Sequence, residues 1–283
     1  MLVKRIIEER LGTTIESISS LSGGDINEVY LVNCGLGQFV IKYNSSTRFP
    51  KMFYKEAEGL NALRDSKLIT PVVVDHFEHM EDQFLVLEYV KEEKKEKKFW
   101  TNFAESLSVL HQKTSSSFGF GQDNYIGSLK QPNAQMSHWV DFFVSKRLKP
   151  LVRMAFDKKL MDKKHLIDFD EFYKKLFDLL PVEEPSLLHG DLWAGNLLCN
   201  FKQQAVFIDP AVYYGHREVD IAMTKMFGGF DPAYLYEYDE RFPLTKGWQE
   251  RIPIHNLYPH LVHLVLFGSS YLRGIENVLE RYH

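Results

Sequence analysis

A short polar segment between two apolar runs constrains this chain more than any other feature. The segment reads Leu187-Leu188-His189-Gly190-Asp191-Leu192-Trp193-Ala194-Gly195-Asn196-Leu197-Leu198. A further apolar run, Val206-Phe207-Ile208, ends at Asp209, thirteen positions after Asn196. Short apolar runs bounded by polar residues predict buried strands. The fold must therefore place several polar side chains at the ends of such strands.

The spacing of these polar residues is that of a known catalytic loop. It matches His-x-Asp-x-x-x-x-Asn, the pattern of protein-kinase-like enzymes. In phosphoryl transfer a carboxylate accepts the proton of the attacking hydroxyl, and hard oxygen ligands hold Mg²⁺. We therefore predict that Asp191 is the catalytic base and that Asn196 and Asp209 are the metal ligands. We expect His189 to brace the loop through hydrogen bonds.

The first ninety residues predict the nucleotide-binding half of such a site. The run Phe39-Val40-Ile41-Lys42 resembles the strand whose lysine binds phosphates. A predicted helix from Pro50 to about Arg64 carries Glu56 on its apolar face, so we expect a Lys42–Glu56 pair. Two further pairs of nucleotide contacts are expected, from a glycine loop and from the backbone at the end of a strand: Gly23 and Gly24, then Glu88 and Val90.

The pattern of apolar residues divides the chain at a mixed charge run, residues 91–98. Residues 1–90 predict a helix at 2–11, the helix after Pro50, and strands at 15–21, 28–32, 38–43, 71–77 and 84–89. Residues 99–283 predict mainly helices, at 99–113, 137–156, 162–180, 219–227 and 255–282. We expect an α+β fold, bilobal and protein-kinase-like. Its N-lobe is a small antiparallel sheet, and its larger C-lobe is mainly helical and carries the catalytic loop.

Three segments make the chain resemble the fructosamine kinase (ketosamine-3-kinase) family, in the aminoglycoside-phosphotransferase-like branch. They are the loop with Trp193 inside it, the run from Ile208 to Ala222, and the run from Phe118 to Gly127. The resemblance implies a kinase that uses ATP and Mg²⁺ to phosphorylate the 3-hydroxyl of ketosamines. Ketosamines are sugars attached to amines by glycation, free or on protein lysines, and the implied role is protein deglycation.

The substrate side is expected near Trp193, two residues after the predicted base. Its indole could stack on a sugar or hold a cationic amine, or it could be a core residue that steadies the loop. We also expect His216 and Glu218 to shape the substrate side, and Asp220 to brace the catalytic loop. Two other functions stay open. One is a kinase for another hydroxyl acceptor, such as an aminoglycoside or a choline-like alcohol, and the other is a nucleotide-binding pseudokinase.

Composition excludes some partners. The chain has 283 residues, with 34 Lys and Arg against 38 Asp and Glu, a formal net charge of −4. A dedicated nucleic-acid binder would carry a basic excess. Two cysteines are too few for a disulfide framework, and no apolar run reaches the length of a membrane span. We expect a cytoplasmic protein with no nucleic-acid or membrane partner; the oligomeric state stays open, with a monomer favoured.

Overall fold

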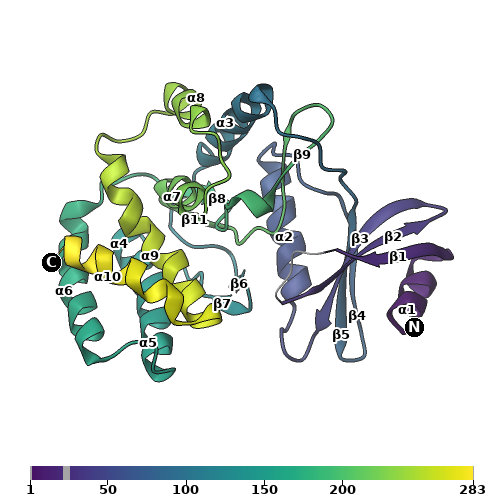
Figure 1. Cartoon of the computed structure of the whole chain (residues 1–283), viewed down its shortest axis with the longest axis horizontal. Helices are drawn as coiled ribbons and strands as arrows, with labels where there is room; N and C mark the ends of the chain where they lie inside the picture. Colours follow the sequence, from purple (N-terminus) through teal and green to yellow (C-terminus); the bar gives the residue numbers. More distant parts are fainter. Residues whose placement is uncertain (1, 22–25, 283) are drawn as a thin grey trace. The chain divides into compact units, whose positions relative to one another are not determined.

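The computed structural model describes residues 2–21 and 26–282, which fold as two compact units (Figure 1). The first unit comprises Met1–Phe99 and Gly195–Asp209. The second comprises Trp100–Ala194 and Pro210–His283. The segment Gly195–Asp209, which we expected in the C-lobe, thus packs with the N-terminal residues. Within the described ranges, no helix combines the length and the apolar character needed to cross a membrane.

The first unit is built on a five-stranded antiparallel sheet of order β1-β2-β3-β5-β4. Its strands are β1 (Ile15–Ser20), β2 (Glu28–Cys34), β3 (Gly37–Ser45), β4 (Val73–His79) and β5 (Asp82–Glu88). Two helices accompany the sheet, α1 (Leu2–Leu11) and α2 (Met52–Asp65). All seven elements were expected from the sequence, with bounds that differ by a few residues.

The side chains of β3 alternate between the two faces of the sheet, which determines the face on which Lys42 lies. Ile41 is fully buried and belongs to an apolar cluster that also contains Ile6 and Ile7 of α1. Successive side chains of a strand point to opposite faces, so Lys42 points to the other face of the sheet. Helix α2 contacts β4 and β5 and buries Phe53 and Leu60.

A small hairpin brings the C-terminal segment of the first unit into place. Strands β9 (Leu197–Cys199) and β10 (Ala205–Phe207) pair antiparallel, with Phe207 opposite Leu197. The Phe207 amide donates to the Ile69 carbonyl at 2.9 Å, and the Glu93 amide donates to the Cys199 carbonyl at 2.8 Å. The hairpin is thus held by backbone bonds to residues far away in the sequence.

The second unit is mainly helical, as expected. Its helices are α3 (Lys97–His111), α4 (Trp139–Phe142), the π-helix η1 (Phe143–Leu148), α5 (Lys149–Asp157), α6 (Lys163–Leu179), α7 (Glu218–Met226), α8 (Ala233–Arg241), α9 (Trp248–Phe267) and α10 (Leu272–Arg281), with a short 3₁₀ turn η3 (Ser269–Tyr271). Its short strands are β6 (Asn124–Ile126), β7 (Leu129–Gln131), β8 (Ser186–Leu188) and β11 (Tyr213–Gly215), paired as β6–β7 and β8–β11. The first residues of α3 and the last two of a second 3₁₀ turn, η2 (Ala194–Asn196), belong to the first unit.

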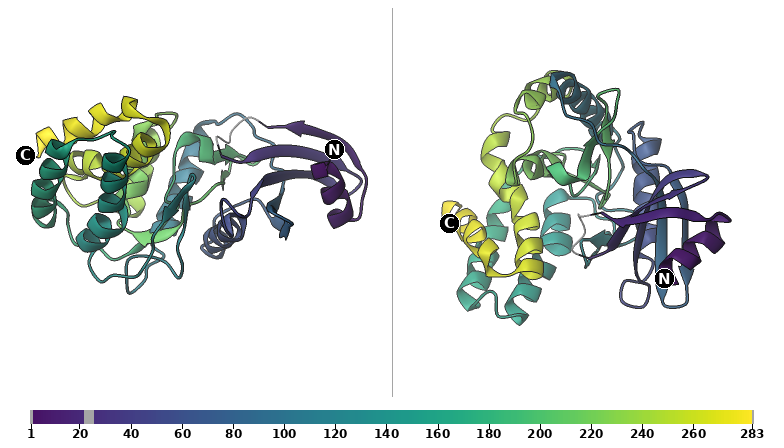
Figure 2. Two further views of the ribbon diagram at one scale, coloured as in Figure 1. Left: turned by 90° about the horizontal axis from the view of Figure 1, so that it is seen from below. Right: turned by 45° about the vertical axis from the view of Figure 1, so that its right-hand side comes forward.

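One helical prediction is corrected in this unit, in two respects. The single helix expected at 255–282 is two helices, because the backbone breaks at Gly268, whose φ is +97°. The first of them, α9, begins earlier, at Trp248, and continues through Pro253 and Pro259. Figure 2 shows α9 and α10 beside α5 and α6, and α9 also packs on α7.

Candidate active site

Lys42 of β3 lies between two carboxylates in the first unit. Its Nζ donates to Glu56 Oε1 at 2.6 Å and also to Asp209 Oδ1. Burial by itself would lower the pKa of Lys42, but Asp209 and Glu56 outweigh that effect, and the pKa lies above its ordinary value. The structure therefore holds a charged, almost fully buried ammonium on β3, and the expected pairing with Glu56 is present.

Asp209 sits at a strained backbone position. Its φ is +53°, in the left-handed region that non-glycine residues seldom adopt. Such conformations cost about 1–3 kcal/mol and concentrate at functional sites. Since 37% of the Asp209 side chain is exposed, the carboxylate stays accessible while it accepts from Lys42.

The β9–β10 hairpin places Asn196 and Asp209 at the same end. Asn196 comes directly before β9, and its carbonyl accepts from the Ile208 amide at 3.1 Å. Asp209 is the next residue of the chain. An amide oxygen and a carboxylate are donors that Mg²⁺ prefers, so this end of the hairpin has the chemistry of the predicted metal ligands.

In the second unit, the catalytic loop depends on one glycine. Gly190 has φ +81°, and a Cβ at this position would lie 2.1 Å from the Ala211 carbonyl oxygen. The Ala211 amide donates to the His189 carbonyl at 2.9 Å, which holds the two segments at this short separation. Only glycine fits, so the middle residue of His189-Gly190-Asp191 is required by packing as well as by backbone conformation.

Asp220 of α7 holds the backbone of the same loop. Its carboxylate accepts from the His189 amide at 2.7 Å and from the Gly190 amide at 3.0 Å. It also contacts His111 Nε2 of α3 at 3.3 Å, and His111 Nδ1 lies 2.8 Å from the Tyr238 hydroxyl. Burial lowers the pKa of His111. Asp220 therefore braces the residues just before Asp191, as expected from the sequence.

The loop itself closes through two local bonds. The Asp191 amide donates to His189 Nδ1 at 3.3 Å, and the Trp193 amide donates to the Asp191 carbonyl at 3.1 Å. His189 is fully buried and braces the loop, as predicted. Trp193 is 40% exposed, so it is not the core residue of the alternative interpretation.

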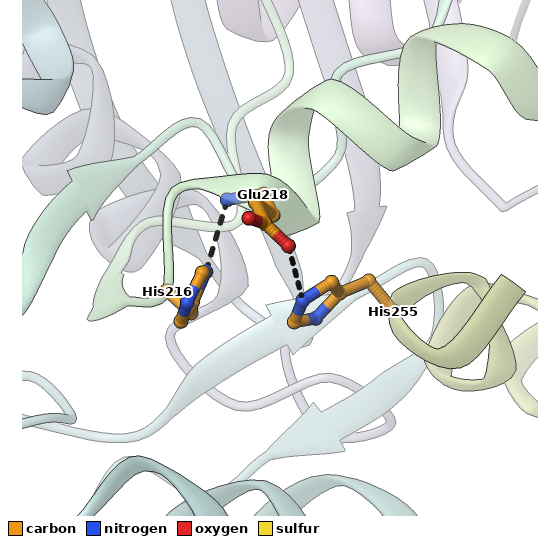
Figure 3. Close-up of side chains that lie close together, drawn as sticks. All are labelled: His216, Glu218 and His255. Carbon is orange, nitrogen blue, oxygen red and sulfur yellow. Dashed lines mark hydrogen bonds and ion pairs between the residues drawn. The ribbon is translucent and has the colours of Figure 1, made fainter. Parts of the chain in front are cut away.

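His216 and Glu218 require a correction, because both are buried. They are 0% and 1% exposed, so the structure leaves their side chains no surface that a substrate could touch. Glu218 accepts from Arg251 Nε at 2.9 Å and from Arg251 Nη2 at 2.5 Å, and His255 Nε2 lies 3.3 Å from it. Figure 3 shows Glu218 between the two imidazoles, with its backbone amide directed at His216.

This cluster is an interior ion pair. One ligand atom each of His216, Glu218 and His255 lie within 4.8 Å of one another, a spacing that can suit a metal ion. However, Arg251 already neutralises the carboxylate through both of its oxygens. Burial would raise the pKa of Glu218, but hydrogen bonds from His255 and Arg251 hold it at about 2. We assign the cluster to the joining of α7 and α9, which positions the helix that carries Asp220.

The remaining nucleotide contacts stay predictions. Gly23 and Gly24 lie outside the described residues. Glu88 ends β5, where its amide donates to the Val72 carbonyl at 2.9 Å and its carboxylate accepts from the Val72 amide at 3.2 Å. Val90 follows two residues later and is half-buried.

The class of protein follows from the two sets of residues and from solved structures. The fold is α+β and protein-kinase-like: an aminoglycoside phosphotransferase, APH(4)-Ia, crystallised as a ternary complex with ADP and hygromycin B, aligns with a TM-score of 0.67 over 100% of this chain and 99% of that one. At 16% identity this likeness concerns the fold alone. The family model for fructosamine kinase matches residues 1–283. The chain belongs to the fructosamine kinase family.

Individual relatives agree with this assignment. A probable ketoamine kinase of Vibrio parahaemolyticus is 40% identical over 268 residues, which are 92% of this chain and 90% of the relative. A chloroplastic protein-ribulosamine 3-kinase of Arabidopsis thaliana is 32% identical, over 98% of this chain and 86% of the relative. The crystal structure of a putative fructosamine-3-kinase from Thermobifida fusca has a TM-score of 0.88 at 30% identity, covering 98% and 97% of the two chains.

Proposed function

We propose that this protein is an ATP-dependent kinase that phosphorylates the 3-hydroxyl of ketosamines of the ribulosamine or fructosamine type. The observation that carries the proposal is the ion pairing of Lys42 with both Glu56 and Asp209 in a chain of this family. A lysine paired with a helix glutamate positions nucleotide phosphates in this fold. The relatives named for ketoamines and for ribulosamine support the acceptor.

The reaction needs one proton acceptor and one electrophile. Asp191 accepts the proton of the 3-hydroxyl as that oxygen attacks the γ-phosphorus of ATP. The bond from the γ-phosphorus to the bridging oxygen breaks, ADP leaves with its electron pair, and the phosphate ester forms. A base positioned in this way contributes roughly 10²–10⁴-fold to such a step.

Lys42 and the hairpin bind the nucleotide in this scheme. The Lys42 ammonium, kept charged by its carboxylates, contacts phosphate oxygens. Asn196 and Asp209 would hold Mg²⁺, which when bound neutralises charge on the phosphates. Asp220 keeps the loop backbone in place, and Trp193 presents an exposed ring next to the base for the sugar.

Several finer properties belong to the same proposal. Phosphorylation at the 3-position would serve protein deglycation, with either a free ketosamine or a glycated protein lysine as substrate. The scarcity of cysteine supports a cytoplasmic location, and the weakly acidic charge supports the absence of a nucleic-acid partner. No observation favours an aminoglycoside or choline-like acceptor over a ketosamine. The presence of every expected charged residue of the site argues against a pseudokinase.

An ADP-release assay tests the proposal. Purified protein with Mg²⁺ and ATP is given a ribulosamine, a fructosamine, an aminoglycoside or choline in separate reactions. We expect turnover with the ketosamines alone. Turnover with only the other acceptors would keep the kinase chemistry and reject the proposed substrate, and ATP binding without turnover on any acceptor would support a pseudokinase.

A further inference from the structure

A row of aromatic side chains runs away from the catalytic loop on the second unit. We call the following residues the aromatic row: Trp193, Phe227, His263, Phe267 and Tyr271. The ring centroids of Trp193 and Phe227 are 6.3 Å apart, and those of Phe227 and His263 are 4.9 Å apart. His263 continues to Phe267 at 5.4 Å and to Tyr271 at 5.0 Å. The row therefore begins two residues after Asp191 and ends at the junction of α9 and α10.

The start of the row is fixed against the loop by a close backbone approach. Phe227 follows α7 directly, and the chain then turns through Gly228 and Gly229, whose φ values are +72° and +85°. A Cβ on Gly229 would lie 2.6 Å from the Cβ of Ala194, the neighbour of Trp193. The turn after Phe227 is thus packed on the catalytic loop, which sets the two rings edge to face, with an interplanar angle of 74°.

Three rings of the row are open to solvent, and His263 and Tyr271 are half-buried. Trp193, Phe227 and Phe267 are 40%, 43% and 47% exposed. Burial lowers the pKa of His263, and its Nδ1 lies 2.7 Å from the Pro259 carbonyl. That imidazole is therefore neutral at pH 7 and donates to the Pro259 carbonyl, so the row carries no charge of its own. Exposed aromatic rings that contact one another are one of the surface features that mark binding sites.

Continuity with the catalytic loop indicates the occupant. In a ketosamine the sugar is covalently bonded to an amine, so the rest of the molecule leaves the site within a few bonds of the reacting hydroxyl. The adduct of a small amine such as methylamine has nothing to place on a row of rings. A glycated lysine in a peptide has an aliphatic side chain and flanking residues, which aromatic faces bind well.

We propose that the aromatic row beyond Trp193 binds the aglycone of the substrate, the lysine side chain and adjacent peptide of a glycated protein. The inference rests on the proposed function and extends it from the sugar to the group that the sugar modifies. It assigns a specificity role to Phe227, His263, Phe267 and Tyr271, and it favours glycated peptides over ketosamines of small amines as substrates.

The test compares two substrates that carry the same sugar. One is the ketosamine of methylamine, and the other carries that sugar on the lysine of an end-blocked apolar pentapeptide. We expect the wild-type protein to prefer the peptide in kcat/KM. Phe227→Ala and Phe267→Ala should each lower kcat/KM for the peptide about tenfold, through KM, which corresponds to about 1.4 kcal/mol. Turnover of the methylamine adduct should stay within about twofold.

A matched control is Phe177→Ala, which removes an exposed ring of α6 outside the row; Phe177 is 60% exposed. This substitution should leave kcat/KM unchanged for both substrates. If Phe227→Ala and Phe267→Ala lowered kcat/KM equally for both substrates, or did not lower it for the peptide, the aglycone role would be overturned. Turnover of either ketosamine would still support the proposed function. If the Phe227→Ala or Phe267→Ala substitution changed the oligomeric state but not kcat/KM, the aromatic row would be a self-association surface, and this result would also contradict the inference.

A second measurement does not depend on turnover. The unglycated pentapeptide should bind the wild-type protein, and Phe227→Ala and Phe267→Ala should weaken that binding in calorimetric titration, while Phe177→Ala should not. If no ketosamine were phosphorylated, the proposed function would fail, and this titration would still decide whether the row binds peptide. Equal binding by all four proteins would reject the row as a peptide site.

Discussion

Lys42 and Asp209 form a partly buried ion pair although 167 positions separate them in the sequence. The pair connects the central strand of the sheet with the end of the β9–β10 hairpin. Glu56 shares the same ammonium from α2. The residues that we propose for the nucleotide therefore form a single charged cluster built from a strand, a helix and a hairpin within one unit.

Removing the shared cation should destabilise this unit. Breaking a buried ion pair costs about 3–5 kcal/mol when one charge is left without its partner, and Lys42→Met leaves two carboxylates side by side. We expect the free energy of unfolding in urea to fall by about 3 kcal/mol. Adding Glu56→Gln to the Lys42→Met variant should recover part of the loss, and no recovery would show that the two carboxylates do not repel each other.

The Asp220 carboxylate should act on turnover through the loop backbone. Asp220→Asn places an amide nitrogen where His189 and Gly190 both donate, so one N–H loses its acceptor. We expect kcat to fall roughly 10-fold or more, with the KM for ATP nearly unchanged. The control is Glu240→Gln, an exposed acid of α8, which should keep full activity. A selective rise in KM for ATP would contradict the positioning role.

The close packing of the catalytic loop at Gly190 can be tested by substitution with alanine, with Gly121 as the control. Gly190→Ala forces a Cβ against the Ala211 carbonyl at a left-handed φ, whereas a Cβ on Gly121 meets nothing within 4 Å. We expect Gly190→Ala to lower both the melting temperature and kcat, and Gly121→Ala to change neither. Normal turnover of the Gly190→Ala protein would mean that the loop can shift away from Ala211 without cost.

Acid should destabilise the second unit through the buried cluster of α7 and α9. Burial and the neighbouring His255 lower the pKa of His216 to about 4, below its ordinary value of 6.5. The unfolded chain then binds more protons between these values, so stability falls as the pH drops from about 6.5 to 4. The loss is about 3 kcal/mol when complete. His216→Gln should flatten this part of the curve of unfolding free energy against pH, and an unchanged slope would contradict the assignment.

Glu218 should also make the protein less stable as the pH falls, in a lower pH range than His216. Its pKa of about 2 in the fold lies below the ordinary 4.5, so its contribution is present above about pH 4.5 and is lost as the pH falls toward 2. Urea unfolding of Glu218→Gln at pH 3 and pH 6 separates this loss from that of His216. We expect the difference in stability between wild type and variant to shrink at pH 3. A constant difference would show that Glu218 is not ionised in the fold.

The sequence predicts the charged residues of the site better than it predicts their surroundings. Lys42, Glu56 and Asp220 each have a local pattern, namely a lysine in a short apolar strand, an acid on an apolar helix face and an acid within a packed helix, and the catalytic-loop motif makes the first two informative. His111 and Tyr238 lie far from the loop in sequence, and no local pattern marks them, although they complete the support of Asp220. Only the tertiary structure brings these side chains together.

The predictions that were wrong also failed because of contacts between residues far apart in the sequence. We expected His216 and Glu218 on the substrate side, but both are buried, and the burial of the Glu218 carboxylate is made possible by Arg251, 33 positions further along the chain. Pro253 lies in the turns of α9 that the prediction missed, because proline usually ends a helix, and Gly268 divides the predicted helix 255–282 in two. The segment 195–209 joins the first unit because its hairpin bonds to Ile69 and Glu93, which its sequence does not reveal.

The most direct test of the account locates the new phosphate. Purified protein, Mg²⁺, ATP and a fructosamine are incubated, and the product is examined by ³¹P and ¹H NMR, beside the Asp191→Asn variant. The account predicts a phosphate ester at the 3-oxygen of the sugar, formed by the wild-type protein and at least about 10²-fold more slowly by a variant that still binds ATP. A phosphate on another oxygen, or an Asp191→Asn variant as fast as wild type, would contradict it.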